Sequence, residues 1–481
     1  FRATLDAVCA KSGWTEKYHG PRAARRATLE IGDCGLEIEE TDPGAKRQSP
    51  IVNPQSSIAN LESPIPNPQS PIVRGIGIGC GGFVSGAGYC IYRGQVQLSH
   101  EKPREHFQKR SIFPHANAIV KISEDGMAAV LLIGAAEIGQ GSDTILVQMC
   151  AESLGIPPAR VRIRSEDSDI SPLDLGAYSS RVTLMAGHAV SRAAAAVVDK
   201  LRPYAAAMLE CAPADVVARD GRMLRLRIGD CGLETTEGLG IGDWRLEIER
   251  RKRDASRQSP MRNPESPIAN PQSPISNLQS SSVAWEEVAR RYFNENGPLV
   301  GTGCYKPPDG LGGDYKGATV GTSPAYSFGS AVCEVAVDLE TGKVQVERFT
   351  DYHDCGTPIN PQQVHGQVEG AVVMGASEVV LEDVQFDAAG RILNPNLHGY
   401  LMMTIKDAPE IFSGLVDSYE PRGPFGAKEI GEGSTLPVLG AVAHAIANAT
   451  GVWIKDLPIT PEKILKAMRE KKAVPRDVYS T

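Results

Sequence analysis

The chain has 481 residues, a formal net charge of −8 and 41% hydrophobic residues, enough for two or three domains with a sizeable core. The acidic balance gives no support for nucleic acid or an anionic membrane as a partner. No run of about 18 apolar residues exists, and no secretory signal is visible in FRATLDAVCAKSGW. We therefore expect a cytoplasmic protein without a membrane span.

Ten cysteines are scattered along the chain, and none lies in a CxxC pair or in the spacing of a zinc or iron–sulfur site. We expect reduced and mostly buried thiols, as is usual in the cytosol. Any iron–sulfur cluster that works with this chain should therefore lie on another polypeptide.

Segments 31–72 and 241–282 repeat one another without gaps, with more than half of their positions identical. Both contain a seven-residue unit of the type Asn-Pro-Gln-Ser-Pro-Ile-x, whose prolines exclude a coiled coil. Such tracts bury little apolar surface. We expect two low-complexity insertions, residues 27–73 and 223–282, that are repetitive sequence tolerated in surface loops. The alternative is a pair of docking or spacer arms.

Outside the insertions the sequence predicts one continuous α+β unit, divided into residues 1–26, 74–222 and 283–481. Alternation of apolar and polar residues predicts strands at 118–122, 127–133, 331–337 and 344–350. Helical periodicity and end signals predict helices at 188–209, 437–450 and 461–471 and one more after Ser142 or Asp143, either of which can cap it.

Two short motifs invite an interpretation that their surroundings do not support. Gly77–Gly82 matches GxGxxG, but a strand-like segment follows where a dinucleotide site needs a helix. His353-Asp354-Cys355 resembles a metal triplet, but adjacent side chains point in different directions. We expect strands at the first motif and a loop at the second.

Two glycine-rich loops carry the strongest functional signal. The segments GAAEIGQG (134–141) and GAKEIGEG (426–433) hold Gln140 and Glu432 between glycines ahead of a helix. Such turns let the backbone approach a bulky ligand closely. Partial burial would suit Glu432 to general base chemistry. Ser179 and Ser180 precede an alanine-rich helix, which is consistent either with simple capping or with an anion site.

Four long motifs occur in one order: GAAEIGQGSDTILVQMCAESLGIP, DLGAYSSRVTLMAGHAV, EVAVDLETGKVQVERFTDYHDCGTPINPQQVHGQVEGAVVMG and GPFGAKEIGEGSTLPVLGAVAHAIANATGV. With them the chain resembles the molybdopterin-binding large subunit of the xanthine dehydrogenase and aldehyde oxidase family, over essentially everything outside the insertions. The resemblance implies an α+β, C-terminal molybdopterin-binding domain. Residues 1–26 would be the tail of the first molybdenum-binding domain, and 74–222 and 283–481 the second.

The resemblance also implies roles for single residues. Glu432 would be the general base that takes a proton from a Mo–OH group, which attacks an electron-poor carbon while hydride passes to Mo=S. Gln140 would bond a molybdenum oxo ligand, and Gly431 would let the Glu432 loop approach the metal. The remaining positions would hold the cofactor: Ser179, Ser180 and Gln367 by side chains, and Gly139 and Gly141 by backbone N–H groups.

The family's cofactor is molybdopterin, with the cytosine dinucleotide form among the options. Its iron–sulfur clusters and FAD would lie on a small and a medium partner subunit. DLGAYSSRVT and AKEIGEG are most similar to the 4-hydroxybenzoyl-CoA reductase branch, which removes an aromatic hydroxyl. We therefore expect a molybdopterin-dependent oxidoreductase that hydroxylates or reductively dehydroxylates a small aromatic or heterocyclic substrate.

The resemblance begins at the tail of the first molybdenum domain. We expect either a truncated fragment or half of a split subunit, completed by another polypeptide that supplies the missing domains. An inactive remnant or scaffold subunit with proline-rich arms is the alternative. The presence of both Gln140 and Glu432 favours the enzyme.

The insertions yield a first prediction. Replacing residues 27–73 and 223–282 each by a short Gly/Ser linker should change the midpoint of thermal unfolding only slightly, because their composition cannot support a core. A large loss of stability, or resistance of the Asn-Pro-Gln-Ser repeats to proteolysis, would show that they pack or dock.

Overall fold

The computed structural model describes residues 1–18, 71–86, 116–225, 282–306 and 323–473. Most of the two expected insertions, residues 19–70 and 226–281, lies outside the described residues. Strand pairing places their ends slightly differently from the sequence boundaries. Strand β1 (Ile72–Val84) pairs with a neighbouring strand from its first residue, and β6 (Arg222–Arg225) and β7 (Ser282–Ala284) pair with each other.

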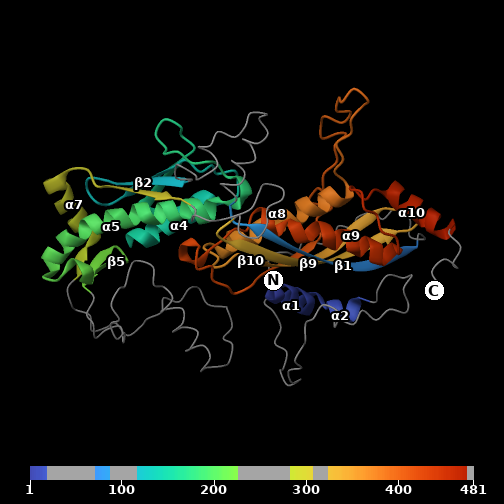
Figure 1. Cartoon of the computed structure of the whole chain (residues 1–481), viewed down its shortest axis with the longest axis horizontal. Helices are drawn as coiled ribbons and strands as arrows, with labels where there is room; N and C mark the ends of the chain where they lie inside the picture. The colour runs from blue at the N-terminus through green and yellow to red at the C-terminus, as the bar shows by residue number, and fades with distance from the viewer. Residues whose placement is uncertain (19–70, 87–115, 226–281, 307–322, 474–481) are drawn as a thin grey trace, which may run out of the picture.

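The described residues form two α+β halves that lie side by side (Figure 1). The elements of the first half are β2 Ala116–Ile122, β3 Ala129–Ile133, α4 Ser142–Leu154, β4 Val161–Ser165, α5 Gly187–Leu209, β5 Val216–Arg219, β6, β7, α7 Trp285–Asn296 and β8 Val300–Tyr305. Its main sheet has the order β4-β3-β2-β8, and β5-β6-β7 form a small second sheet. Helices α4 and α5 close the core, in which Leu131, Leu146 and Val190 are fully buried.

The elements of the second half are β1, β9 Tyr326–Asp338, β10 Val344–Asp354, α8 Pro361–Val380, β11 Glu410–Leu415, α9 Leu436–Thr450 and α10 Pro461–Ala473, with the N-terminal helices α1 Arg2–Ser12 and α2 Trp14–Lys17 beside them. Its sheet has the order β1-β9-β10-β11, with only β10 and β11 parallel. Helices α8 and α9 bury one face, with Phe349, Val372 and Ala441 in the core.

The GxGxxG motif lies within β1, as expected, and its glycines have a packing role. A Cβ atom at Gly77 would lie 2.1 Å from the backbone N of Ala445, and one at Gly79 would lie 1.9 Å from the carbonyl O of Pro437. Helix α9 therefore rests directly on the backbone of β1. The first half repeats the arrangement, because a Cβ at Gly303 in β8 would lie 2.1 Å from the carbonyl O of Ala189 in α5.

The predicted α+β class and the predicted helices and strands are confirmed, with ends shifted by a few residues. The four predicted strands correspond to β2, β3, β9 and β10, and α9 ends at Gly451 in the left-handed conformation. His353 and Asp354 lie at the end of β10 and not in a loop, because they pair with Gly329 and Phe328 of β9. The described residues contain no cluster of potential metal-ligating side chains.

The thiols are less buried than expected. All seven cysteines in the described part of the chain are free; Cys150, Cys333 and Cys355 are buried, whereas Cys80 and Cys304 are exposed. No helix within the described ranges is long and apolar enough to cross a membrane.

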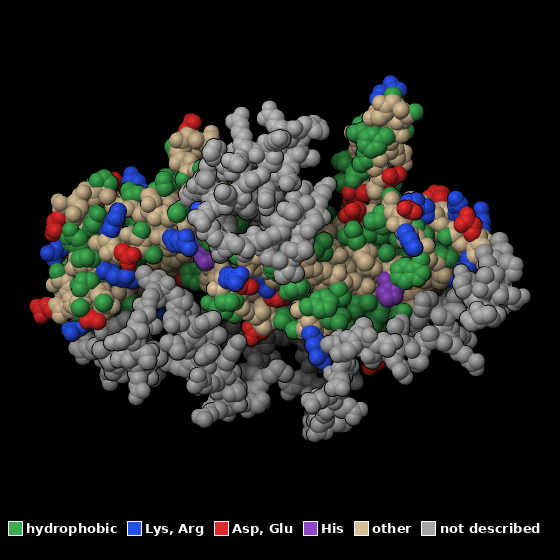
Figure 2. Space-filling view, in the orientation of Figure 1, with side chains coloured by type: hydrophobic (Ala, Val, Ile, Leu, Met, Phe, Trp, Pro, Cys, Tyr) green, Lys and Arg blue, Asp and Glu red, His purple; other side chains and the backbone are tan. Residues whose placement is uncertain are grey.

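Residues 382–409, between α8 and β11, form an arm that projects from the second half (Figure 2). Its exposed large hydrophobic residues are Val384, Phe386, Ile392, Leu393, Leu397, Leu401, Met402 and Ile405. At the base of the arm Met403 packs against the core of the second half, whereas these exposed side chains belong to neither core.

The contact between β1 and α9 yields a prediction. Gly77→Ala should lower the free energy of unfolding by about 1–3 kcal/mol, because the helix must move to admit the methyl group. Gly366→Ala is the matched control, since its Cβ would meet nothing within 4 Å on α8 and alanine is the better helix former. Urea denaturation of both variants would measure the difference, and equal stabilities would contradict the packing argument.

A buried carboxyl group in the same half yields another prediction. Asp351 is fully buried, and neither carboxyl oxygen has a hydrogen-bond partner among the described residues. Burial raises its pKa to about 7, with the charge of His353 opposing the rise. Between its ordinary pKa of 3.8 and this value, the folded protein keeps a proton that the unfolded chain has lost. The free energy of unfolding should therefore fall as pH rises through this window.

Asp351→Asn removes this titration. The stability of the wild-type protein should fall between pH 4.5 and pH 7.5 by more than that of the variant, by up to about 3–4 kcal/mol. Urea denaturation across this range would measure the two slopes. Parallel curves would show that Asp351 is ionised in the folded state.

Candidate active site

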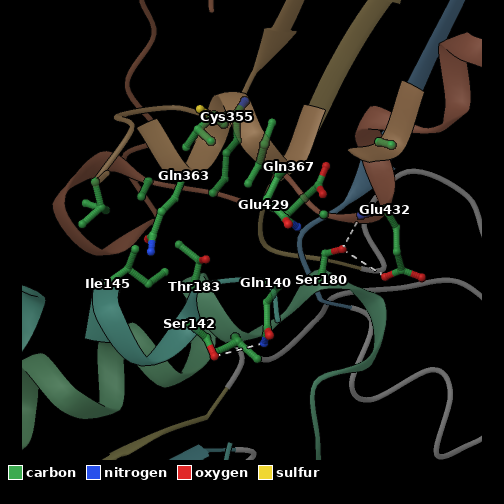
Figure 3. Close-up of a pocket in the computed structure, with 18 of the residues that line it drawn as sticks. Gln140, Ser142, Ile145, Ser180, Thr183, Cys355, Gln363, Gln367, Glu429 and Glu432 are labelled. Carbon is green, nitrogen blue, oxygen red and sulfur yellow. Dashed lines mark hydrogen bonds between the residues drawn. The ribbon is translucent and has the colours of Figure 1, made fainter. Parts of the chain in front are cut away.

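A cavity of about 600 Å³ lies between the two halves, where four helices begin (Figure 3). Its polar wall comes from residues at or just before the starts of α4, α5, α8 and α9, namely Gln140, Ser142, Ser180, Thr183, Gln363, Gln367, Glu432 and Thr435. Apolar side chains such as Ile145, Val182 and Met374 line the remainder. Because helix N-termini carry partial positive charge, this arrangement suits a large ligand with anionic or polar groups.

The loop before α4 is organised by Glu137. Its Oε1 accepts the N–H groups of Gly139 and Gly141 at 2.8 and 3.0 Å, and its Oε2 accepts the N–H of Asp143 at 2.9 Å. These bonds hold the pKa of Glu137 below its usual value although its partial burial opposes them. Glu137, and not the expected Ser142 or Asp143, therefore caps the helix. The N–H groups of Gly139 and Gly141 are thereby occupied, contrary to the role expected for them.

Gln140 is displayed by this loop at the edge of the cavity. Gly139 and Gly141 on either side have φ values of +97° and +82°, which favour glycine. The Gln140 carboxamide accepts the N–H of Ile138 at 2.6 Å and donates to the carbonyl of Ala136 and to Ser142 Oγ, both at 3.0 Å. The side chain is therefore held in one orientation.

Ser180 and Glu432 come from opposite halves and meet at the cavity (Figure 3). Ser180 Oγ donates to Glu432 Oε2 at 3.0 Å and accepts the Glu432 N–H at 2.9 Å. A Cβ at Gly431 would lie 2.9 Å from Ser180 Oγ, so glycine there permits this approach. Ser179 is buried and does not line the cavity.

The Glu432 side chain is exposed, so it lacks the partial burial that the sequence left open. The buried carboxylate of this loop is Glu429, which is 1% exposed and also lines the cavity. Its Oε2 accepts the N–H of Gly433 at 3.3 Å. Both glycine-rich loops read Glu-Ile-Gly-x-Gly, and in both the first residue accepts the N–H of the last. In each loop the carboxylate of the first glutamate therefore lies against the backbone of the turn, and the polar side chain between the two glycines is left facing the cavity.

Helix α8 supplies Gln367, as expected, and Gln363, which sequence reasoning missed. Asn360 caps this helix by accepting the Gln363 N–H at 3.2 Å. The Oε1 atom of Gln363 is buried and has no hydrogen-bond partner within the described residues, so it can accept a bond from a ligand. Gln363 lies four residues before Gln367 and so on the same face of the helix, and this spacing could have identified it from the sequence.

Cationic side chains contribute little to the cavity. Among the lining residues that the structure describes, Lys428 is the one cation, and its Nζ lies 2.8 Å from Asp354 Oδ2. An anionic ligand would therefore depend on helix N-termini, hydroxyls and amides. This donor set fits a pterin with a phosphate group, and the cavity volume falls within the usual range for cofactor sites.

Comparison with known proteins supports this assignment. Residues 53–236 and 252–409 match the family described as the molybdopterin cofactor-binding domain. The xanthine dehydrogenase molybdenum-binding subunit of Escherichia coli O157:H7 is 29% identical over 73% of this chain and 39% of that protein. The carbon monoxide dehydrogenase large chain of Hydrogenophaga pseudoflava is 27% identical over 71% of this chain and 36% of its own length.

The same fold occurs in a solved structure. Quinoline 2-oxidoreductase from Pseudomonas putida 86 matches with a TM-score of 0.62 at 24% identity, over 83% of this chain and 42% of that chain. The chain spans less than half the length of these relatives. Since the family match covers more than half of the sequence, the chain belongs to the molybdopterin-binding family that includes xanthine dehydrogenase and carbon monoxide dehydrogenase.

Proposed function

We propose that this chain is the molybdopterin-binding, catalytic part of a hydroxylase-type oxidoreductase that acts on an aromatic or heterocyclic substrate. The observation that carries the proposal is the Ser180–Glu432 contact, which fixes a carboxylate at the rim of a cavity between two halves. Gln140 lines the same cavity from the other glycine-rich loop. The match to the molybdopterin-binding family supports it.

The residues that would hold the cofactor are polar but uncharged. Ser180, Gln363 and Gln367 line the cavity from α8 and from the segment before α5. Gln140 would bond an oxygen ligand of the metal by giving up one of the hydrogen bonds that its amide now donates to Ala136 and Ser142. Gly139, Gly141 and Gly431 would act by shaping the two loops, and Ser179 through the backbone of the Ser180 segment, where its carbonyl accepts the Gly86 N–H.

When bound, the molybdenum cofactor supplies the two-electron redox chemistry that the side chains themselves lack. The chain supplies the proton acceptor. Ser180 Oγ donates to Glu432 Oε2, so we assign Oε1 as the atom that takes the proton released when oxygen is transferred to the substrate carbon. The glycines around Glu432 permit the turn and leave the carboxylate accessible, while Ser180 and Glu429 hold the backbone by accepting the N–H groups of Glu432 and Gly433.

The finer identity of the enzyme is also a proposal. The names of the relatives include quinoline 2-oxidoreductase and nicotine 6-hydroxylase, which favour an N-heteroaromatic substrate. The strings DLGAYSSRVT and AKEIGEG favour the 4-hydroxybenzoyl-CoA reductase branch. A panel of xanthine, quinoline, nicotine and 4-hydroxybenzoyl-CoA would separate these classes. Iron–sulfur and FAD-binding partner subunits would carry the electrons away.

The role of Glu432 has a direct test. In the enzyme assembled with its partner subunits, Glu432→Gln keeps the shape of the side chain and removes the base. Turnover should fall about 10²–10⁴-fold, the usual contribution of a positioned base, with molybdenum content unchanged. Steady-state kinetics together with metal analysis by mass spectrometry would measure both quantities.

Glu340→Gln is the matched control, because Glu340 is an exposed glutamate in the turn between β9 and β10. It should leave turnover unchanged. Near-normal turnover of Glu432→Gln would exclude Glu432 as the base. Wild-type protein that binds no molybdenum with its partners present would instead favour the inactive remnant or scaffold.

A further inference from the structure

The end of β10 and the Glu432 loop are joined by an ion pair on one face and by a buried contact between Glu429 and His353 on the other. Lys428 Nζ lies 2.8 Å from Asp354 Oδ2, and Glu429 Oε1 lies 3.7 Å from His353 Nε2. The side chains of Glu429 and His353 are both completely buried. The backbones are joined as well, because the Lys428 N–H donates to the carbonyl of Cys355 at 2.9 Å.

The buried pair lies directly beneath the turn that carries Glu432. Glu429 Oε2 accepts the N–H of Gly433, the residue after Glu432. A Cβ at Gly433 would lie 2.1 Å from Glu429 Oε1, so the carboxylate is in close contact with this backbone. Ser180 accepts the N–H of Glu432 itself. Two consecutive N–H groups are therefore held, one from each side of the turn.

A buried carboxylate needs a compensating charge, because the interior solvates it poorly. His353 is the basic side chain within 4 Å of Glu429 in the described part of the chain, and neither ring nitrogen of His353 nor Glu429 Oε1 has another hydrogen-bond partner there. Lys428 does not compete for Glu429, because it is paired with Asp354. Asp351, which shares the face of His353 on β10, is a second carboxyl group that interacts electrostatically with His353.

We propose that His353 and Glu429 form a buried positioning pair that fixes the 432–434 turn and so aims the Glu432 carboxylate into the cavity. Neither residue is catalytic in this assignment, since both act through the turn. The catalytic consequence rests on the proposed function of Glu432, whereas the holding of the turn does not. The sequence motif at 353–355 thereby has a role that is not metal binding.

The holding of the turn can be measured without cofactor or substrate. Hydrogen–deuterium exchange in the full chain should show the amides of Glu432, Gly433 and Ser434 exchanging at least about tenfold faster in Glu429→Gln and in His353→Gln than in wild type. Peptides from α5 serve as an internal reference for global unfolding. Glu410→Gln, which breaks an exposed ion pair between β11 and β10, is the matched control and should change nothing at the turn.

The double variant His353→Gln/Glu429→Gln tests whether the two residues act as a pair. His353→Gln alone leaves the buried Glu429 carboxyl group without its partner, and the double variant replaces both partners. The double variant should therefore exchange no faster than His353→Gln alone, whereas independent residues would give additive effects. Unchanged exchange in both single variants, or additive effects, would overturn the pair.

The catalytic consequence is measured in the assembled enzyme. Glu429→Gln should lower kcat about ten- to a hundredfold, because small misplacements of a catalytic group are costly, with KM and molybdenum content little changed. Faster exchange at the turn with unchanged kcat would overturn the positioning role and leave the proposed function standing. Full turnover in Glu432→Gln would remove the proposed function, and the exchange data would still decide whether the pair holds the turn.

Discussion

The close contact between glycine-bearing strands and alanine-rich helices is the constraint on which the rest of the structure depends. Helix α9 lies against the backbone of β1, and α5 lies against the backbone of β8, with no room for a side chain between them. A helix seated in this way cannot slide or rotate without a clash. The residues just before each helix, Glu432 and Ser180, are thereby fixed relative to the two sheets, and they meet where the halves meet.

This geometry also explains why the cavity needs few cations. Four helices begin around it, and their N-termini supply partial positive charge. The N-terminus of α4 is already neutralised within the protein, because the Glu137 carboxylate accepts the N–H groups of Gly141 and Asp143 there. The Glu-Ile-Gly-x-Gly sequence thus serves two purposes in each loop. The glutamate satisfies the backbone of the turn, and the residue between the glycines is left to face the ligand.

Much of this arrangement was accessible from the sequence. Alternation, helix caps and the two glycine-rich loops predicted the elements, and the structure brings Gln140, Ser180, Gln367 and Glu432 to one cavity. The exposure of Glu432 and the burial of Glu429 could not be predicted from it. They depend on packing against Ser180 and His353, which lie about 250 and 80 residues away in the chain. The packing role of the GxGxxG glycines in β1 could not be predicted either, because it depends on the position of helix α9 against the strand.

The Lys428–Asp354 ion pair and the Glu429–His353 contact at the end of β10 also fix the register of the Glu432 loop. Successive side chains alternate between the faces of a strand, so His353 faces inward and Asp354 outward. A slip of one residue in one direction would place Lys428 against His353 and Glu429 against Tyr352, and a slip in the other direction would place Glu429 against Asp354 and Lys428 against Cys355. Only the observed register keeps both the Lys428–Asp354 ion pair and the Glu429–His353 contact. The position of Glu432 three residues later is therefore set by electrostatics at the sheet as well as by the shape of the glycine-rich turn.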